Sequence, residues 1–183
     1  MTELEKMQAG EWYSCIDPEL EALRMIARRA VHEHRVIDPD ERGPIAPRLA
    51  AVFGSVGKDV YIEAPFHCAY GFNIEIGDGV YFNAGCTILD TGPVTIGART
   101  LFGPNVQIYC AEHHRKADLR AAGQEIARPV KVGAGVWIGG GALTLPGVSI
   151  GDRAIIGAGS VVTHDVATGD LVVGNPGRPV RQD

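Results

Sequence analysis

The chain has 183 residues, a length typical of one domain, and a formal net charge of −5 with an isoelectric point near 5.7. Its basic residues form no run that could follow a phosphate backbone, which excludes nucleic acid as the expected partner. No apolar stretch reaches the roughly 18 residues needed to cross a bilayer, and the first residues lack the pattern of a signal peptide. We therefore expect a cytoplasmic protein that does not contact membranes.

The four cysteines, Cys15, Cys68, Cys86 and Cys110, lie far apart and form no CxxC motif, which is the spacing typical of zinc sites and thiol redox centres. Cytosolic thiols stay reduced, and an isolated cysteine then behaves as a small apolar residue. We predict four reduced, buried cysteines and no metal site.

Residues 1–54 lack any repeat. Asp17, Pro18 and Glu19 have the order of a helix N-cap, a first-turn proline and a first-turn acid. The apolar positions of the expected helix share one face and are Leu20, Leu23, Ala27, Ala30 and Val31. A second short helix is expected after Pro44 and Pro47.

From residue 55 onward, apolar residues recur every six positions. Near the C-terminus the series is Val132, Ile138, Thr144, Ile150, Ile156 and Val162, in which Thr144 alone is not aliphatic. A small or β-branched residue follows each member four positions later, at Val136, Ala142, Val148, Ala154, Ser160 and Val166. Upstream the series is Val56, Ile62, Tyr70, Ile76, Phe82, Ile88, Ile96, Phe102 and Ile108, with two extra residues between 62 and 70 and between 88 and 96.

A period of six cannot come from an α-helix, because it is not a multiple of 3.6, and the many glycines and β-branched residues favour short strands joined by tight turns. Six residues form one short strand with its corner, and three such units form a coil. Stacked coils pair as parallel strands around one aliphatic column. We therefore predict a mainly β protein, a parallel β-helix whose open end is covered by the N-terminal helical segment.

The segment IGGGALTLPGVSIGDRAIIGAGSVVTHDV resembles the hexapeptide-repeat acyltransferases, whose coils wind into a left-handed β-helix. The pattern KMQAGEWY followed by DPEL resembles the N-terminal segment of the maltose and galactoside O-acetyltransferases, and the likeness continues to VVGNPGRPVR. We expect an N-terminal segment of this type over 1–54 and a left-handed β-helix acetyltransferase domain over 55–183, with a protruding loop at 109–131 and a tail at 167–183. The resemblance also implies a homotrimer with active sites between neighbouring copies.

The repeat breaks between Ile108 and Val132, and the residues in the gap are too polar to fill a β-helix interior, so we expect them to form a loop outside it. Resemblance of IYCAEHH to the sugar acetyltransferases puts His113 in the place of their catalytic histidine. Transfer from a thioester to a hydroxyl needs a base, and an imidazole with an unperturbed pKa of about 6.5 suits that task. We predict direct acetyl transfer from acetyl-CoA to a sugar or similar small acceptor, with no metal required. His114 is interpreted as a solvated loop residue.

Three further residues follow from the resemblance. Glu125 matches an acidic position that would orient the base, with a surface carboxylate as the alternative. Asn83 matches the asparagine that contacts the acceptor in the galactoside enzyme; the alternative is a corner residue in left-handed backbone geometry. Asp90 matches an aspartate beside the acceptor, and the alternative is a turn before Gly92.

The expected acceptor pocket departs from the family at two places. Ser14 and Cys15 stand where relatives often have an acid, and Ala69 stands where they often have aspartate or serine. Losing carboxylates removes strong charge-assisted acceptors for sugar hydroxyls, so the preferred sugar is not predicted. Asp17 is a candidate substitute, although the N-cap role explains it equally.

For the coenzyme, the resemblance implies contacts along the coils from Gly140, Ala158, Thr163, His164, Arg178 and Arg181. His164 stands where relatives often have a lysine near a coenzyme phosphate, and a mostly neutral imidazole is a weaker phosphate partner. The two arginines would supply positive charge to the nucleotide end, with a solubilising tail as the alternative. Trp137 is expected to face this groove or a neighbouring copy.

Three alternatives to the sugar acetyltransferase stay open. The same repeat and histidine occur in enzymes that acetylate an antibiotic or an amino sugar. Zinc-dependent hydration of carbon dioxide on the same scaffold needs three histidines around one metal, and adjacent His113 and His114 lack that spacing. A non-catalytic assembly scaffold gives no reason for the histidine-bearing loop or for the GNPGRPVR tail.

Overall fold

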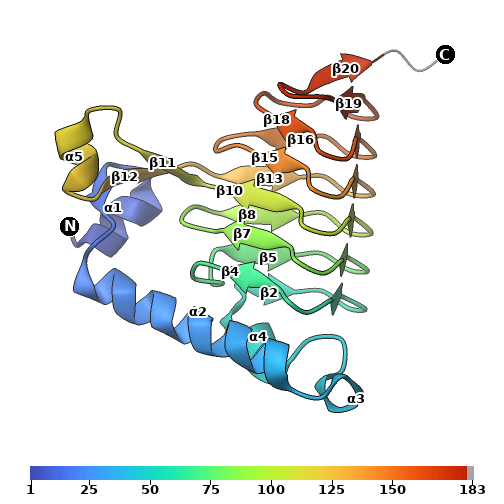
Figure 1. Ribbon diagram of the computed structural model, residues 1–183, viewed down its shortest axis with the longest axis horizontal. Helices are drawn as coiled ribbons and strands as arrows, with labels where there is room; N and C mark the ends of the chain where they lie inside the picture. The colour runs from blue at the N-terminus through green and yellow to red at the C-terminus, as the bar shows by residue number, and fades with distance from the viewer. Residues whose placement is uncertain (181–183) are drawn as a thin grey trace.

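A computed structural model describes residues 1–180, so Arg181 lies outside the described residues. From Ser55 the chain winds in stacked coils through three flat faces in turn (Figure 1). The first face contains β4 (His67–Cys68), β7 (Thr87–Leu89), β10 (Gln107–Tyr109), β15 (Leu143–Thr144) and β18 (Val161–Val162). The second contains β2 (Ser55–Val56), β5 (Ile74–Ile76), β8 (Val94–Ile96), β13 (Val130–Val132) and β16 (Ser149–Ile150).

The third face contains β3 (Tyr61–Ile62), β6 (Tyr81–Phe82), β9 (Leu101–Phe102), β14 (Trp137–Ile138), β17 (Ile155–Ile156), β19 (Leu171–Val173) and β20 (Arg178–Val180). All neighbouring strands in the three faces pair in parallel, except that β20 turns back and pairs antiparallel with β19. The predicted parallel β-helix of six-residue units is confirmed.

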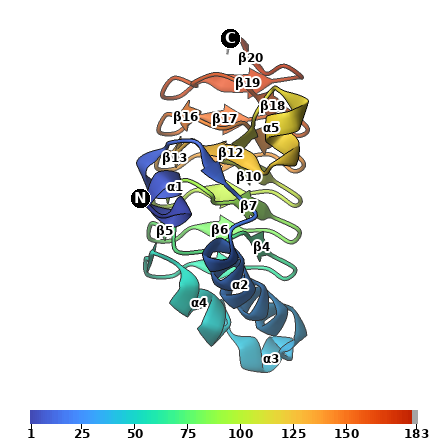
Figure 2. The same ribbon diagram turned by 90° about the vertical axis from the view of Figure 1, so that its left-hand side faces the viewer.

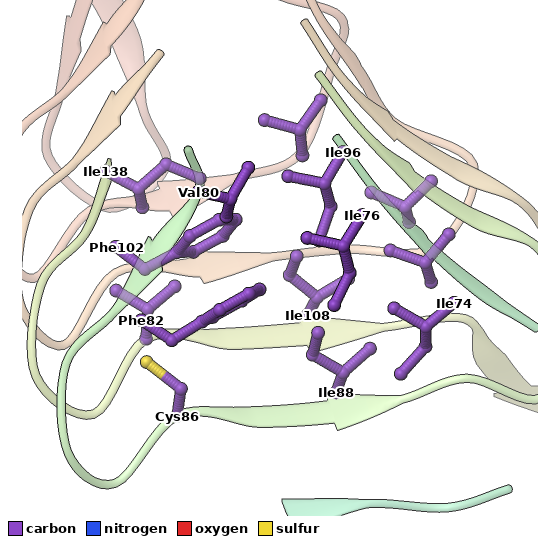
Figure 3. Close-up of a cluster of buried hydrophobic side chains, with 14 of the residues drawn as sticks. Ile74, Ile76, Val80, Phe82, Cys86, Ile88, Ile96, Phe102, Ile108 and Ile138 are labelled. Atoms are coloured by element: carbon purple, nitrogen blue, oxygen red, sulfur yellow. The ribbon is translucent and has the colours of Figure 1, made fainter. Parts of the chain in front are cut away.

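The six-residue series forms the core because each two-residue strand points one side chain outward and one inward. Inward residues of successive coils stack, as Phe82 does on Phe102 with ring centroids 4.3 Å apart (Figure 3). Thr144 occupies the same inward column with no exposed surface, and its hydroxyl has no hydrogen-bond partner within residues 1–180. Thr144, the one member of the C-terminal series that is not aliphatic, therefore places a polar atom inside an apolar column.

One position of the predicted register is wrong. The six-residue series predicts Tyr70 as a column residue, but Cys68 pairs with Ile88 and fills the column instead. Tyr70 packs in a second, smaller core with Met7, Tyr13, Leu20 and Ala127. Its hydroxyl accepts a hydrogen bond of 2.7 Å from Arg24, which a column position inside the aliphatic core would not allow.

This correction shows that the breaks in the repeat share one corner of the prism. The chain passes from the first face to the second between β4 and β5, between β7 and β8, and between β10 and β13. Counted between inward residues of the column, each of these passages is longer than the regular step of six residues. The third passage, residues 110–129, is the long break noted in the sequence. Irregular backbone is therefore stacked along one edge of the molecule.

The N-terminal segment contains α1 (Glu3–Ala9), β1 (Tyr13–Ser14), α2 (Pro18–Val36), α3 (Pro39–Arg42) and α4 (Pro47–Val52). The predicted N-cap is confirmed, since the Asp17 carboxylate accepts from the N–H groups of Glu19 and Leu20. The apolar face of α2 spans both cores: Leu20 lies in the small one, and Ala27 and Ala30 lie against the end of the coil stack. Among the described residues, no helix is long and apolar enough to cross a membrane.

The segment predicted as a protruding loop at 109–131 projects from the coils as an arm, residues 110–129, with its own helix and strands. The arm contains β11 (Ala111–His113), α5 (Ala117–Ala121) and β12 (Gln124–Ala127). β12 pairs antiparallel with β11 on one side and with β1 on the other, so that the N-terminal segment lies beside the arm (Figures 1 and 2). Because its backbone groups are paired in this sheet, a polar segment holds a defined shape outside the coils.

Candidate active site

The three-stranded sheet β1-β12-β11 positions the predicted base and its partner. Glu125, in the central strand β12, lies directly opposite Tyr13 in β1 and directly opposite His113 in β11. Residues directly opposite one another in antiparallel strands point to the same face of the sheet. Register alone therefore gathers a phenol, a carboxylate and an imidazole in one row.

The carboxylate of Glu125 bridges its two neighbours. Its Oε1 accepts a hydrogen bond from the Tyr13 hydroxyl, and its Oε2 lies 3.5 Å from His113 Nε2. The side chain of Glu125 is 7% exposed, whereas that of His113 is 52% exposed. One side of the imidazole thus faces a buried anion while the rest of the ring is open to a ligand.

The small core beneath the row controls its electrostatics. Tyr13 is fully buried, and burial together with the Glu125 carboxylate raises the pKa of the phenol, which therefore stays protonated and donates to Glu125. A buried carboxylate that keeps a hydrogen-bond donor on one oxygen and an imidazole on the other is a suitable partner for an imidazolium.

Cys15 belongs to the same group of side chains. It follows β1 two residues after Tyr13, and alternation along an extended strand brings both side chains to one face. The Cys15 thiol, a ring nitrogen of His113 and a carboxylate oxygen of Glu125 all lie within 4.8 Å of one another. Burial, and then the Glu125 charge, raise the pKa of the thiol. The prediction of buried, reduced cysteines holds for Cys68, Cys86 and Cys110, but Cys15 is only half-buried.

The sequence contains a signal for this contact that lies outside the six-residue repeat. In YSCID, alternation pairs Tyr13 with Cys15 and directs Ser14 to the opposite face. The sequence alone does not reveal which strand pairs with this one, because Tyr13 and Glu125 are 112 residues apart.

His114 faces away from this row and packs against the N-terminal segment. Its ring lies 4.8 Å from that of Trp12, and its Nδ1 accepts a hydrogen bond of 3.0 Å from the Lys116 N–H. His114 is half-buried rather than solvated. Its packing against Trp12 accounts for an imidazole at this position without a chemical role.

Asp90 lies at the base of the arm and is fully buried. Its carboxylate accepts hydrogen bonds from the N–H groups of Ala69, Tyr70 and Gly71 at 2.6–2.9 Å. Burial raises the pKa of Asp90 to about 6, against the lowering effect of these N–H groups. The structure therefore gives this carboxylate three backbone partners and no surface that a ligand could touch within one copy.

Asn83, Gly140 and Ala158 lie on another edge of the prism. Each follows a strand of the third face, at the corner that leads to the first face, whereas the arm leaves the corner between the first and second faces. The Asn83 side chain accepts from the Ala84 N–H at 2.8 Å. Asn83 does not have a positive φ, so left-handed backbone geometry does not account for an asparagine at this corner. Asn105, with φ of 57°, does have that geometry.

His164, predicted near a coenzyme phosphate, and Arg178, predicted at the nucleotide end, line one hollow of about 330 Å3 at the last coil. The hydroxyl oxygen of Thr163 lies 2.8 Å from Nδ1 of the neighbouring His164. Asp165 lines the same hollow, so its charge is mixed rather than uniformly positive. Trp137 stands 54% exposed on the third face, and Asp17 is occupied as the N-cap of α2.

Two family models match the chain. The maltose acetyltransferase hexapeptide capping motif matches residues 6–57, and the bacterial transferase hexapeptide, with six repeats, matches residues 129–164. Nodulation protein L from Rhizobium leguminosarum bv. viciae is 48% identical over 178 residues, which cover 95% of this chain and 92% of that protein.

Solved structures agree over the whole chain. A hexapeptide-repeat-containing acetyltransferase from Vibrio cholerae O1 biovar eltor, complexed with acetyl coenzyme A, is 39% identical with a TM-score of 0.88, covering 99% of this chain and 98% of that one. A galactoside acetyltransferase in complex with coenzyme A is 34% identical with a TM-score of 0.94, covering 100% of this chain and 91% of that one. Stacked hexapeptide coils beside a histidine-bearing arm define a hexapeptide-repeat acetyltransferase. The chain belongs to the maltose and galactoside O-acetyltransferase family of these enzymes.

Proposed function

We propose that the chain transfers an acetyl group from acetyl-CoA directly to a hydroxyl of a sugar or similar small acceptor, with His113 as the general base. Membership of the family makes the chain an acetyltransferase that uses acetyl-CoA as co-substrate. The observation that carries the choice of base is the half-exposed imidazole of His113, backed at 3.5 Å by the buried carboxylate of Glu125.

Glu125 fixes the roles of the two ring nitrogens. Because its Oε2 faces Nε2, we assign the ring proton to Nε2, which leaves the lone pair on Nδ1 for the acceptor. The contact of 3.5 Å is longer than a good N–H···O hydrogen bond, and it is expected to shorten when the imidazole becomes charged. Tyr13 keeps Glu125 in place by its own hydrogen bond.

The transfer then needs no covalent acyl-enzyme. Nδ1 of His113 takes the proton of the acceptor hydroxyl while the hydroxyl oxygen attacks the thioester carbonyl carbon. The carbon–sulfur bond breaks, and the leaving thiolate takes the proton back from the imidazolium. A backbone N–H at a coil corner would stabilise the negative oxygen that forms in between.

We further propose that neighbouring copies complete the site within a homotrimer. In one copy the base lies on the arm, at a different edge of the prism from Asn83, Gly140 and Ala158. The outer side of the third face bears a row of in-register apolar residues that a second copy would cover: Tyr61, Tyr81, Leu101, Trp137, Ile155 and Leu171. In this arrangement the arm of one copy lies against the third-face corner of the next. Light scattering of the full chain measures the assembly.

Replacing His113 by alanine tests the assignment of the base. Thiol release from acetyl-CoA is measured with a panel of sugars, amino sugars and antibiotics, which also separates sugar acetylation from the alternatives. We expect turnover to fall by about 10²- to 10⁴-fold, the usual loss of a general base, with acetyl-CoA affinity by calorimetry unchanged. His114→Ala is the matched control, since the neighbouring imidazole packs on Trp12.

Two outcomes would contradict the proposal. Near-complete activity of the His113→Ala variant would remove His113 as the base. No thiol release with any acceptor, together with no coenzyme binding, would favour a non-catalytic scaffold. The cytoplasmic location predicted from the sequence remains part of this proposal.

A further inference from the structure

The cluster of Cys15, His113 and Glu125 combines three different metal-ligating groups. Their ligand atoms, a thiol sulfur, an imidazole nitrogen and a carboxylate oxygen, lie within 4.8 Å of one another. We propose that these three residues form a binding site for Zn2+, and that the ion switches off the general base when it binds. Binding of the ion stands apart from the proposed function, while the inhibition rests on it.

The spacing of the ligand atoms fits a tetrahedral ion. Zinc bonds of about 2.3 Å to sulfur and 2.0–2.2 Å to nitrogen and oxygen place neighbouring ligand atoms about 3.3–3.8 Å apart. The His113 Nε2 to Glu125 Oε2 distance of 3.5 Å already lies in that range. The most distant pair must close by about 1 Å, which side-chain rotation of the half-buried Cys15 can supply.

The backbone of all three ligands is fixed before any ion arrives. His113 and Glu125 are paired in the arm sheet, and the Cys15 N–H donates to the Gly123 carbonyl at 2.8 Å. Arg24 donates to the Cys15 carbonyl at 2.9 Å, which ties the thiol-bearing turn to α2. Ligands held by a rigid scaffold bind a metal more tightly than ligands that must first be ordered.

A second shell is also present. The Tyr13 hydroxyl donates to Glu125 Oε1, so that Oε2 remains as the oxygen directed to the cluster. Hydrogen bonds of this kind orient metal-ligating carboxylates. With the thiol ionised by the metal, one thiolate and one carboxylate balance the charge of Zn2+, and the thiolate with the imidazole favours Zn2+ over Mg2+ or Ca2+.

Occupancy of this site would stop the proposed transfer. The ion takes Nε2 of His113 and Oε2 of Glu125, so the carboxylate no longer supports the charged imidazole. A divalent cation on the ring also lowers its affinity for a proton. Three protein ligands leave the fourth position of the ion to water.

Calorimetric titration of the full chain with ZnCl2 tests the site without any acetyl transfer. We expect one ion per chain, with proton release from the thiol that two buffers of different ionisation enthalpy reveal. Cys15→Ser and His113→Ala should each weaken binding by more than about 100-fold, and Tyr13→Phe by about 10- to 100-fold. Cys86→Ser is the matched control, because its buried thiol donates to the Gly103 carbonyl and a hydroxyl can replace it.

Substitution by Co2+ gives an independent signature. A sulfur-to-cobalt charge-transfer band is expected for the unmodified chain and for Cys86→Ser, and its absence is expected for Cys15→Ser. Zinc affinity of Cys15→Ser equal to that of the unmodified chain, or the same cobalt band in that variant, would overturn the site. Full acetyl transfer at saturating Zn2+ would overturn the inhibition alone. If Cys15→Ser fails to fold, Glu125→Gln supplies the affinity test: weaker zinc binding is expected, and zinc affinity equal to that of the unmodified chain would overturn the site.

Discussion

The coil stack and the arm sheet use opposite rules of construction. In the coils, strands pair in parallel and direct aliphatic side chains inward, so that Thr144 is a buried hydroxyl in an otherwise apolar column. In the arm, strands pair antiparallel and gather Tyr13, Glu125 and His113 on one face. The regular region supplies stability through repetition, and the region that breaks the repeat supplies reactive groups. The variants below test the buried contacts of the coil stack and the contacts of the arm sheet.

Removal of the Asp90 carboxylate should have the largest effect on stability, because this fully buried group accepts three backbone hydrogen bonds. Asp90→Ala leaves the N–H groups of Ala69, Tyr70 and Gly71 without their buried acceptor. We expect the free energy of unfolding to fall by about 3–5 kcal/mol in denaturant titrations. Asp78→Ala is the control, since its carboxylate accepts from the Lys58 N–H at an exposed site. Equal losses in the two variants would show that burial at the arm base is unimportant.

The cost of that substitution should also depend on pH. The pKa of Asp90 is raised from 3.8 to about 6, so between these values the folded chain binds more protons than the unfolded one. Stability from this group is therefore highest below pH 3.8 and falls as pH rises towards 6, by about 3 kcal/mol at 1.36 kcal/mol per pKa unit. The penalty of Asp90→Ala should be larger at pH 4.5 than at pH 7. A penalty that is constant over this range would refute the raised pKa.

Tyr13→Phe tests whether the arm orients its base through Glu125. Without the phenol, Glu125 loses the hydrogen bond to Oε1 while the aromatic packing remains. We expect kcat to fall by about 10-fold, equivalent to about 1.4 kcal/mol, with little change in acetyl-CoA binding. The profile of kcat against pH should shift as well, because Glu125 would support the imidazolium less well. Loss of stability with no change in that profile would make Tyr13 a packing residue only.

Thr144→Val should change stability with the opposite sign and leave activity unchanged. The substitution exchanges the hydroxyl, which lacks a partner within residues 1–180, for a methyl group of similar volume in the column. We expect a gain of about 1–2 kcal/mol in the free energy of unfolding, since a desolvated polar atom is removed. Acetyl transfer should stay unchanged because the arm is untouched. Destabilisation by the same change would point to a partner for this hydroxyl, such as a buried water.

The sequence predicted the coils well because their pattern is local and repeated. Ile138 and Ile156, for example, needed no knowledge of distant residues to be placed in the core. Prediction is weaker where the repeat is interrupted: the six-residue pattern predicts Tyr70 in the column, whereas Cys68 occupies that position in the structure. A two-residue insertion fits the six-residue pattern equally well on either side of a short strand, and only pairing with Ile88 decides between them.

The sequence predicts that a segment projects from the coils, but not the secondary structure of that segment. Polarity of the segment excluded it from the core, yet its strands depend on pairing with β1, more than a hundred residues away in the chain. The helix α1, by contrast, had a local signal in Thr2 and Glu5, which form a capping box. Resemblance predicts a role for His113, and the arm sheet brings Tyr13 and Cys15 to the same cluster.

The coil stack also sets the distance along its axis between the start of the arm and the hollow at the last coil. The arm leaves the first face after β10, and the hollow lined by His164 and Arg178 follows β18, two strands further along the same face. Since paired strands are about 4.8 Å apart, the number of intervening turns fixes an axial separation of about 10 Å. A chain lengthened or shortened by one complete turn would keep both places intact and change their spacing by a single strand width.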